Sequence, residues 1–114
     1  MKGSPPGPDE VAFWELAEPL LERPGVERST MMGLPCVRLN GAFFASFDRR
    51  NGNLLVKLTR PRVDELVATE AAVAFAPAGR RFREWAAIPV VLAGSWNGLL
   101  EEAMQAAAER SHPA

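Results

Sequence analysis

Two Asn-Gly pairs, at positions 40–41 and 51–52, constrain the fold of this chain more than any other local feature. Asn-Gly favours a type I′ hairpin turn, whose two central residues both need a positive φ. Each pair is flanked by short segments in which apolar residues run together or alternate with polar ones. We therefore predict a three-strand antiparallel meander, with strands at residues 36–39, 42–47 and 54–58.

Alternation within the middle strand assigns its side chains to two faces of the sheet. Successive residues of a strand point to opposite faces, so residues two apart share a face. We expect Phe43, Ala45 and Phe47 on one face and Phe44 and Ser46 on the other. Core packing explains the phenylalanines on whichever face is covered.

A helical spacing of apolar residues precedes the meander. The predicted helix begins with Asp9 as its N-cap, and Asp9 and Glu10 place negative charge at the positive end of the helix dipole. The Pro-Gly pair at positions 24–25 ends it, because the residue before a proline avoids the helical conformation. Pro19 falls inside the pattern and predicts a kink or an earlier helix end.

Two more helices are predicted after the meander. One begins at Pro61, since proline suits a first helical turn, and ends near Thr69. The last helix has Asn97 as its N-cap. Its apolar residues follow the i, i+3, i+4, i+7 spacing of a buried helix face. They are Leu100, Ala103, Met104 and Ala107.

Two strands are predicted between these helices, at residues 72–75 and 83–92, with a turn at 77–79 and with Pro89 near an edge or a bulge. The element order is therefore α-β3-α-β2-α. One antiparallel sheet with helices on one face buries all of these apolar stripes. We expect an α+β fold, a two-layer α/β sandwich.

The length of 114 residues predicts one domain. We place it at residues 9–110, with disordered tails at 1–8 and 111–114. The longest apolar stretches are far too short to span a bilayer. No charged segment followed by an apolar one opens the chain as in a secretory signal, so we expect a cytoplasmic protein without membrane contact.

Few residues offer catalytic or metal-binding chemistry. The single cysteine, Cys36, is interpreted as a small core residue, and the single histidine, His112, lies in a predicted tail that cannot hold a general base in place. The carboxylates show no metal-ligand spacing, and the glycines form no nucleotide-binding loop. We therefore expect no catalytic residue, no cofactor and no metal, and interpret the chain as a non-enzyme.

Charge is unevenly distributed along the chain, although the total is only -1. The central part of the sequence is basic and both terminal parts are acidic, and arginines gather at the predicted turns. Arginine at a hairpin tip can reach a phosphate backbone, and each neutralised phosphate releases counterions. We therefore predict a contact with double-stranded DNA. The candidate residues are Arg49, Arg50, Lys57, Arg60, Arg62, Arg80, Arg81 and Arg83.

Two other interpretations remain open. The arginines could serve solubility and discourage edge-to-edge aggregation, while an uncovered sheet face contacts a protein partner or a second copy of the chain. An enzyme that uses arginine and backbone amides on a small anion would need a deep pocket. Steep salt dependence would favour phosphate binding over apolar sheet pairing.

Several segments together resemble the MmcQ/YjbR family, which is often grouped with the TfoX amino-terminal domain. The resemblance covers roughly residues 10–110, through individually weak structural motifs. It departs from the family pattern at Ala42, where a lysine is frequent, and at 78–84, which lack a frequent histidine. The segments that carry it are RPGVE at 23–27, GLPCVRLNGAFFA at 33–45, LLVKL at 54–58, RVDEL at 62–66 and EWAAIP at 84–89.

The resemblance implies a compact α-β3-α-β2-α fold. Members of the family are described as DNA-binding proteins with a "double wing", a description based more on fold than on demonstrated chemistry. In this chain the two wings would be the hairpins that carry Arg49-Arg50 and Arg80-Arg81.

Overall fold

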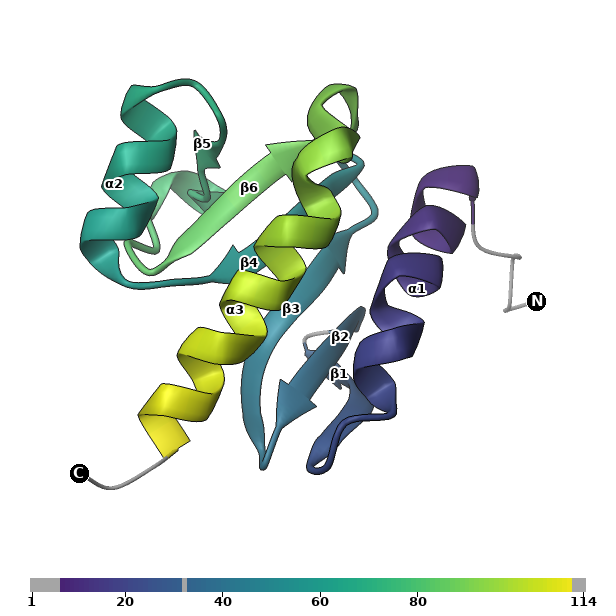
Figure 1. Cartoon of the computed structure of the whole chain (residues 1–114). Helices are drawn as coiled ribbons and strands as arrows, with labels where there is room; N and C mark the ends of the chain where they lie inside the picture. The colour runs from purple at the N-terminus through teal and green to yellow at the C-terminus, as the bar shows by residue number, and fades with distance from the viewer. Residues whose placement is uncertain (1–6, 32, 112–114) are drawn as a thin grey trace.

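The computed structural model describes residues 7–31 and 33–111 (Figure 1). Three helices and one antiparallel six-stranded sheet form the fold, and the strand order in the sheet is β1-β2-β3-β4-β6-β5. The helices are α1 (Pro8–Leu21), α2 (Arg60–Ala68) and α3 (Trp96–Ser111). The strands are β1 (Val26–Met31), β2 (Leu34–Leu39), β3 (Ala42–Asp48), β4 (Asn53–Lys57), β5 (Val73–Ala74) and β6 (Trp85–Pro89).

The predicted meander is confirmed as β2, β3 and β4. Asn40 and Gly41 have φ values of 51° and 86°, the pair of positive values that a type I′ turn requires. Gly52, in the second turn, has a φ of 69°. The prediction of an α+β fold with one antiparallel sheet is therefore confirmed. The finer arrangement that the family resemblance implies stays a prediction.

A β-bulge changes the predicted faces of β3. The register moves from Val37 opposite Ala45 to Arg38 opposite Phe43, which leaves Phe44 as an extra residue in β3. Phe44 is fully buried and packs in the same core as Ala45. The assignment of Phe44 to the opposite face is therefore wrong, because a bulge breaks the period of two.

The strand β1 was not predicted. It pairs with β2 along its whole length, from Val26 opposite Leu39 to Met31 opposite Leu34. Its sequence, VERSTM, is mostly polar, as is common in a strand at the edge of a sheet. Its own residue pattern predicts no strand, and the hydrogen bonds to β2 hold it in the sheet. The observed element order is therefore α-β4-α-β2-α.

Several predicted boundaries shift. The first helix begins at Pro8 with Gly7 as its N-cap, not with Asp9. It continues two residues past Pro19 to Leu21, because the backbone N–H that proline lacks affects only its last turn. In α3, Asn97 lies in the first turn and is not the N-cap.

The last predicted strand is shorter than expected. It covers residues 85–89, and a 3₁₀ segment, Val90–Ser95, replaces its predicted second half. The β5 strand has two residues and lies at the edge of the sheet beside β6. Residues 1–6 and 112–114, which include most of both predicted tails and His112, lie outside the described residues.

The helices pack side by side on one face of the sheet, with α3 across β3 and β4 (Figure 1). An aromatic cluster marks the contact of α1, β3 and α3. The Phe47 ring centroid lies 5.9 Å from that of Phe13 and 6.2 Å from that of Trp96. Trp96 is fully buried, and its Nε1 donates a hydrogen bond of 3.1 Å to the Ile88 carbonyl. Among the described residues, no helix has both the length and the apolar character needed to cross a membrane.

Candidate functional site

The sheet divides the eight predicted DNA-contact residues between two ends of the molecule. In the antiparallel pair of β4 and β6, Asn53 lies opposite Pro89 and Lys57 lies opposite Trp85. The turn that precedes Asn53 and the connection that precedes Trp85 are therefore at opposite ends of β4. Four steps of about 3.3 Å separate these ends, roughly 13 Å. Arg49 and Arg50 lie at one end, and Lys57, Arg60, Arg62, Arg80, Arg81 and Arg83, the α2-end cluster, lie at the other.

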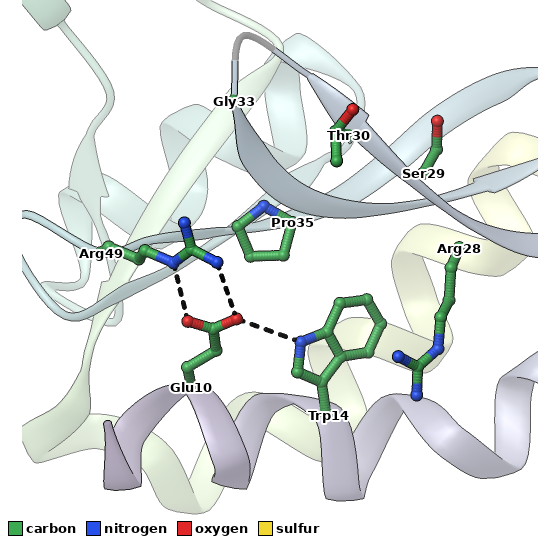
Figure 2. Close-up of a pocket in the computed structure, with 8 residues that line it drawn as sticks. All are labelled: Glu10, Trp14, Arg28, Ser29, Thr30, Gly33, Pro35 and Arg49. Carbon is green, nitrogen blue, oxygen red and sulfur yellow. Dashed lines mark hydrogen bonds and ion pairs between the residues drawn. The ribbon is translucent and has the colours of Figure 1, made fainter. Parts of the chain in front are cut away.

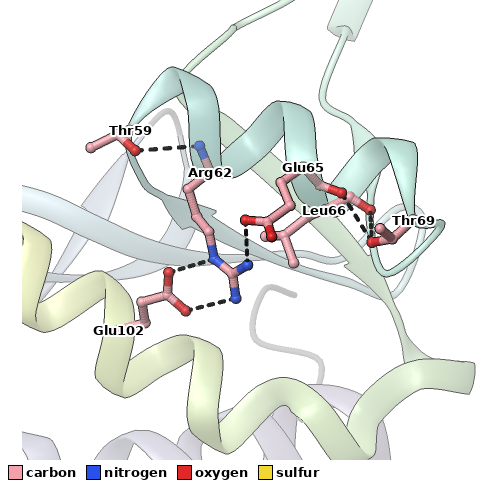
Figure 3. A network of polar contacts seen from close by, with 6 residues as sticks. All are labelled: Thr59, Arg62, Glu65, Leu66, Thr69 and Glu102. Atoms are coloured by element: carbon pink, nitrogen blue, oxygen red, sulfur yellow. Dashed lines mark hydrogen bonds and ion pairs between the residues drawn. The ribbon is translucent and has the colours of Figure 1, made fainter.

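Within the α2-end cluster, Arg62 connects two helices (Figure 3). Its Nε and Nη2 donate hydrogen bonds of 2.6 and 3.1 Å to the Glu102 carboxylate in α3, and its Nη1 donates one of 2.9 Å to Glu65. The bond to Glu102 is the main cause that raises the pKa of the Arg62 guanidinium. The side chain of Thr59, the N-cap of α2, accepts from the Arg62 backbone N–H. Arg62 thus has a structural partner for most of its donors.

Two other cations of the cluster form exposed ion pairs. Arg81 Nη2 lies 3.2 Å from Asp64 Oδ1, which ties the connection between β5 and β6 to α2. Lys57 Nζ lies 3.8 Å from Glu84 Oε1. Exposed ion pairs of this kind contribute little to stability, about 0–1 kcal/mol, so an incoming anion can replace their carboxylates at low cost.

The remaining three arginines of the cluster have no ion pair in the described part of the chain. Arg60 opens α2, and Arg80 and Arg83 lie on the connection that leads into β6. The Arg80 side chain contacts an aromatic ring, with its guanidinium carbon 5.5 Å from the Phe82 centroid. All three residues are exposed. Their donors therefore face solvent without a competing carboxylate.

Backbone hydrogen bonds hold the connection between β5 and β6, which carries Arg80 and Arg83. The Phe82 N–H donates to the Phe75 carbonyl at 2.8 Å, and the Leu58 N–H donates to the Glu84 carbonyl at 2.9 Å. The second bond ties the connection to the residue that follows β4. Arg80 and Arg83 thus project from an ordered loop.

At the other end of β4, Arg49 binds a carboxylate from α1. Its Nε and Nη2 donate hydrogen bonds of 2.8 and 3.2 Å to Glu10, and Trp14 Nε1 donates a third of 3.3 Å (Figure 2). Glu10 is only 5% exposed. The bond from Arg49 is the largest effect on the Glu10 carboxyl and lowers its pKa, against the opposing effect of burial. The neighbouring Arg50 is exposed, and its side chain has no ion pair among the described residues.

These contacts border an open cleft of about 460 Å³ between α1 and the β1–β2 hairpin (Figure 2). Arg28, from β1, lies over the Trp14 ring with its guanidinium carbon 4.3 Å from the ring centroid. Sequence reasoning missed this cleft because it missed β1 and interpreted Glu10 only through the helix dipole. The residues that line it are Glu10, Trp14, Arg28, Ser29, Thr30, Gly33, Pro35 and Arg49.

Few side chains in the described part of the fold are candidates for a nucleophile or a metal ligand. Cys36 is fully buried, and burial raises the pKa of its thiol, so the thiol stays protonated at neutral pH. Within residues 7–31 and 33–111, no three His, Cys, Asp or Glu side chains gather where they could hold a metal ion.

No protein-family model matches this chain, and neither the search of curated proteins nor that of solved structures finds a significant similarity. The resemblance to the MmcQ/YjbR family therefore stays a prediction from the sequence motifs.

Proposed function

We propose that this chain is a cytoplasmic, non-enzymatic protein that binds the phosphate backbone of double-stranded DNA through its α2-end cluster. One observation carries the proposal. Arg60, Arg80 and Arg83 lie at the same end of the sheet, exposed and without a carboxylate partner among the described residues. The family resemblance implies the same function.

The chemistry of the cluster supports a phosphate contact. A guanidinium group stays charged at all relevant pH values and presents a planar fork of donors that matches phosphate oxygens. Arg81 and Lys57 flank the three unpaired arginines and can exchange their exposed carboxylate partners for phosphate. The proposed contact therefore includes up to five cations.

The hairpin that carries Arg49 and Arg50 is not part of the proposed contact. It lies at the opposite end of β4, and the Arg49 guanidinium is already bound to Glu10. Of the two arginines, Arg50 alone has no ion pair among the described residues. We therefore assign binding to one end of the molecule instead of to two equivalent wings.

The test is fluorescence anisotropy of a labelled DNA duplex, titrated at 50 and 200 mM salt. With three phosphates neutralised, counterion release predicts about 40-fold weaker binding at the higher salt. The variant Arg60→Ala/Arg80→Ala/Arg83→Ala should bind at least tenfold more weakly at 50 mM salt. Circular dichroism establishes that each variant folds.

A charge-matched control separates position from net charge. The variant Arg23→Ala/Arg50→Ala/Arg110→Ala also removes three positive charges, but outside the cluster. It should bind DNA within about threefold of the wild type, since salt screens charges that lie outside the direct contact. An equal loss in both variants would contradict the assigned contact. No binding at 50 mM salt would contradict DNA binding itself.

A second candidate is self-association through an exposed apolar segment between β6 and α3. Val91 is 83% exposed, and Val90 and Leu92 beside it are exposed as well. The sheet face that was predicted to contact a partner exposes less apolar surface than this segment, because Leu55 and Ala87 at its centre are buried. Sedimentation equilibrium distinguishes the two candidates. A dimer that dissociates in Val91→Asp, with no DNA binding, would favour this second function.

A further inference from the structure

We propose that the cleft between α1 and the β1–β2 hairpin binds a small organic anion and that Arg28 recognises its carboxylate or phosphate group. The cleft lies at the end of β4 opposite the α2-end cluster. This site is therefore independent of the proposed DNA contact.

Arg28 has no carboxylate partner within the described residues, whereas the neighbouring carboxylates are bound to other groups. Glu10 in the cleft wall accepts from both Arg49 and Trp14. Glu27, the residue before Arg28, lies 3.5 Å from Arg38 Nε. Arg28 has no ion pair among the described residues, so it contributes a positive charge that no carboxylate neutralises.

An aromatic ring orients the Arg28 side chain. Its guanidinium carbon lies 4.3 Å from the centroid of the Trp14 ring, a cation–π contact. The Arg28 side chain donates no hydrogen bond within the described residues, so its N–H groups stay available for a bidentate bond to a carboxylate or phosphate. Trp14 is in turn held by its bond to Glu10. The ordering of Arg28 therefore precedes ligand binding.

The cleft around Arg28 combines positive charge with an apolar wall (Figure 2). Thr30 and Pro35 lie in its lining beside Arg28, and Pro35 supplies an apolar wall. Arg49 also lines the cleft, and its Nη1 takes no part in the two bonds to Glu10. Two arginines and one glutamate leave the lining with a net charge of +1. This combination favours an anion attached to a small apolar group.

The size of the cleft fits such a ligand. Its volume of about 460 Å³ lies within the range of small-molecule pockets, roughly 300–1,000 Å³. Its open shape argues for modest affinity, since much of the ligand stays in contact with water. We expect dissociation constants in the millimolar range or tighter, which NMR titration measures directly.

The experiment is a ¹H–¹⁵N NMR titration of the full chain at constant ionic strength. Benzoate, phenyl phosphate and inorganic phosphate are the three probes, added to 20 mM. We expect saturable shifts of the Trp14 indole N–H for at least one probe. Benzoate alone would indicate a carboxylate ligand, and the two phosphates would indicate a phosphate ligand. The Trp96 indole, which is bonded to the Ile88 carbonyl in the core, is the internal reference.

Variants make the assignment to Arg28 specific. Arg28→Gln should weaken binding at least tenfold, and Arg28→Lys, which keeps the charge but loses the planar fork, at least threefold. Arg110→Gln removes the same charge from the last turn of α3, outside both proposed sites, and should leave probe binding unchanged. Dispersed amide spectra establish that each variant is folded.

Two results would overturn the proposal. One is the absence of any saturable Trp14 shift with all three probes, and the other is undiminished binding in folded Arg28→Gln. DNA titration of Arg28→Gln keeps the two functions distinguishable. Its affinity for duplex should stay within about twofold of the wild type, because Arg28 lies outside the proposed DNA contact.

Discussion

Arg62 of α2 and Glu102 of α3 lie 40 positions apart in the sequence and are joined by two hydrogen bonds of 2.6 and 3.1 Å. Both donors come from one guanidinium group and both acceptors from one carboxylate. This bidentate geometry is the strongest form of an arginine–carboxylate contact. It connects the short helix α2 to the long helix that covers the centre of the sheet.

The first prediction concerns this contact. Arg62→Ala should lower the free energy of unfolding by about 1 kcal/mol, because the pair is half-buried and well aligned but still partly screened by water. Urea denaturation at neutral pH measures the loss. Arg60→Ala, in the same helix but without an ion pair among the described residues, is the control and should change stability by less than about 0.5 kcal/mol. Equal effects of the two substitutions would show that the pair does not stabilise the fold.

The second prediction concerns the pH dependence that Glu10 confers. Its folded-state pKa is lowered, chiefly by the bond from Arg49. The pair therefore stabilises the fold above the ordinary glutamate pKa of 4.5, and this contribution is lost as pH falls through the lowered value. Glu10→Gln should unfold at lower urea concentration at pH 7, and the difference from wild type should shrink below about pH 4.5.

The control for Glu10 is Glu15→Gln in the same helix. Glu15 is exposed and has no ion pair in the described part of the chain. Its substitution should leave the pH profile of stability parallel to that of the wild type. If the Glu10→Gln profile were also parallel across this range, the Arg49 pair would not be the source of the dependence.

The third prediction concerns Gly25, which links α1 to β1. Its φ is +83°, and an added Cβ would clash with the Asn40 side-chain oxygen. The Asn40 N–H also donates a bond of 2.8 Å to the Gly25 carbonyl, which holds the two backbones together, and the added Cβ would lie 3.2 Å from Leu39 Cδ1 as well. Gly25→Ala should therefore suffer both backbone strain and a steric clash.

Gly41→Ala isolates the strain component. Gly41 has a similar φ of +86°, but its added Cβ meets no atom within 4 Å. It should lose about 1–2 kcal/mol from the left-handed conformation alone. Gly25→Ala should lose clearly more, as measured by urea denaturation. A loss no greater than that of Gly41→Ala would mean that Asn40 relaxes freely.

The turns and the second helix were predictable from the sequence because short-range chemistry determines them. Asn40-Gly41 takes positive φ values at low cost. Thr59 as the N-cap and Pro61 in the first turn favour the start of α2 regardless of the tertiary contacts of that segment. The strand β1 and the bulge at Phe44 were not predictable in this way. Each depends on pairing with a neighbouring strand, and a polar edge sequence carries no period of its own.

For the arginines of the candidate site, too, the sequence determines some properties and the tertiary structure determines others. Their presence near the turns and their excess in the central segment are properties of the sequence. Which of them remain unpaired depends on carboxylates that are distant along the chain, such as Glu10 for Arg49 and Glu102 for Arg62. The pairing of β4 with β6 further separates Arg50 from Arg83. An ion pair depends on distance in space, and only the packing of helices on the sheet sets that distance.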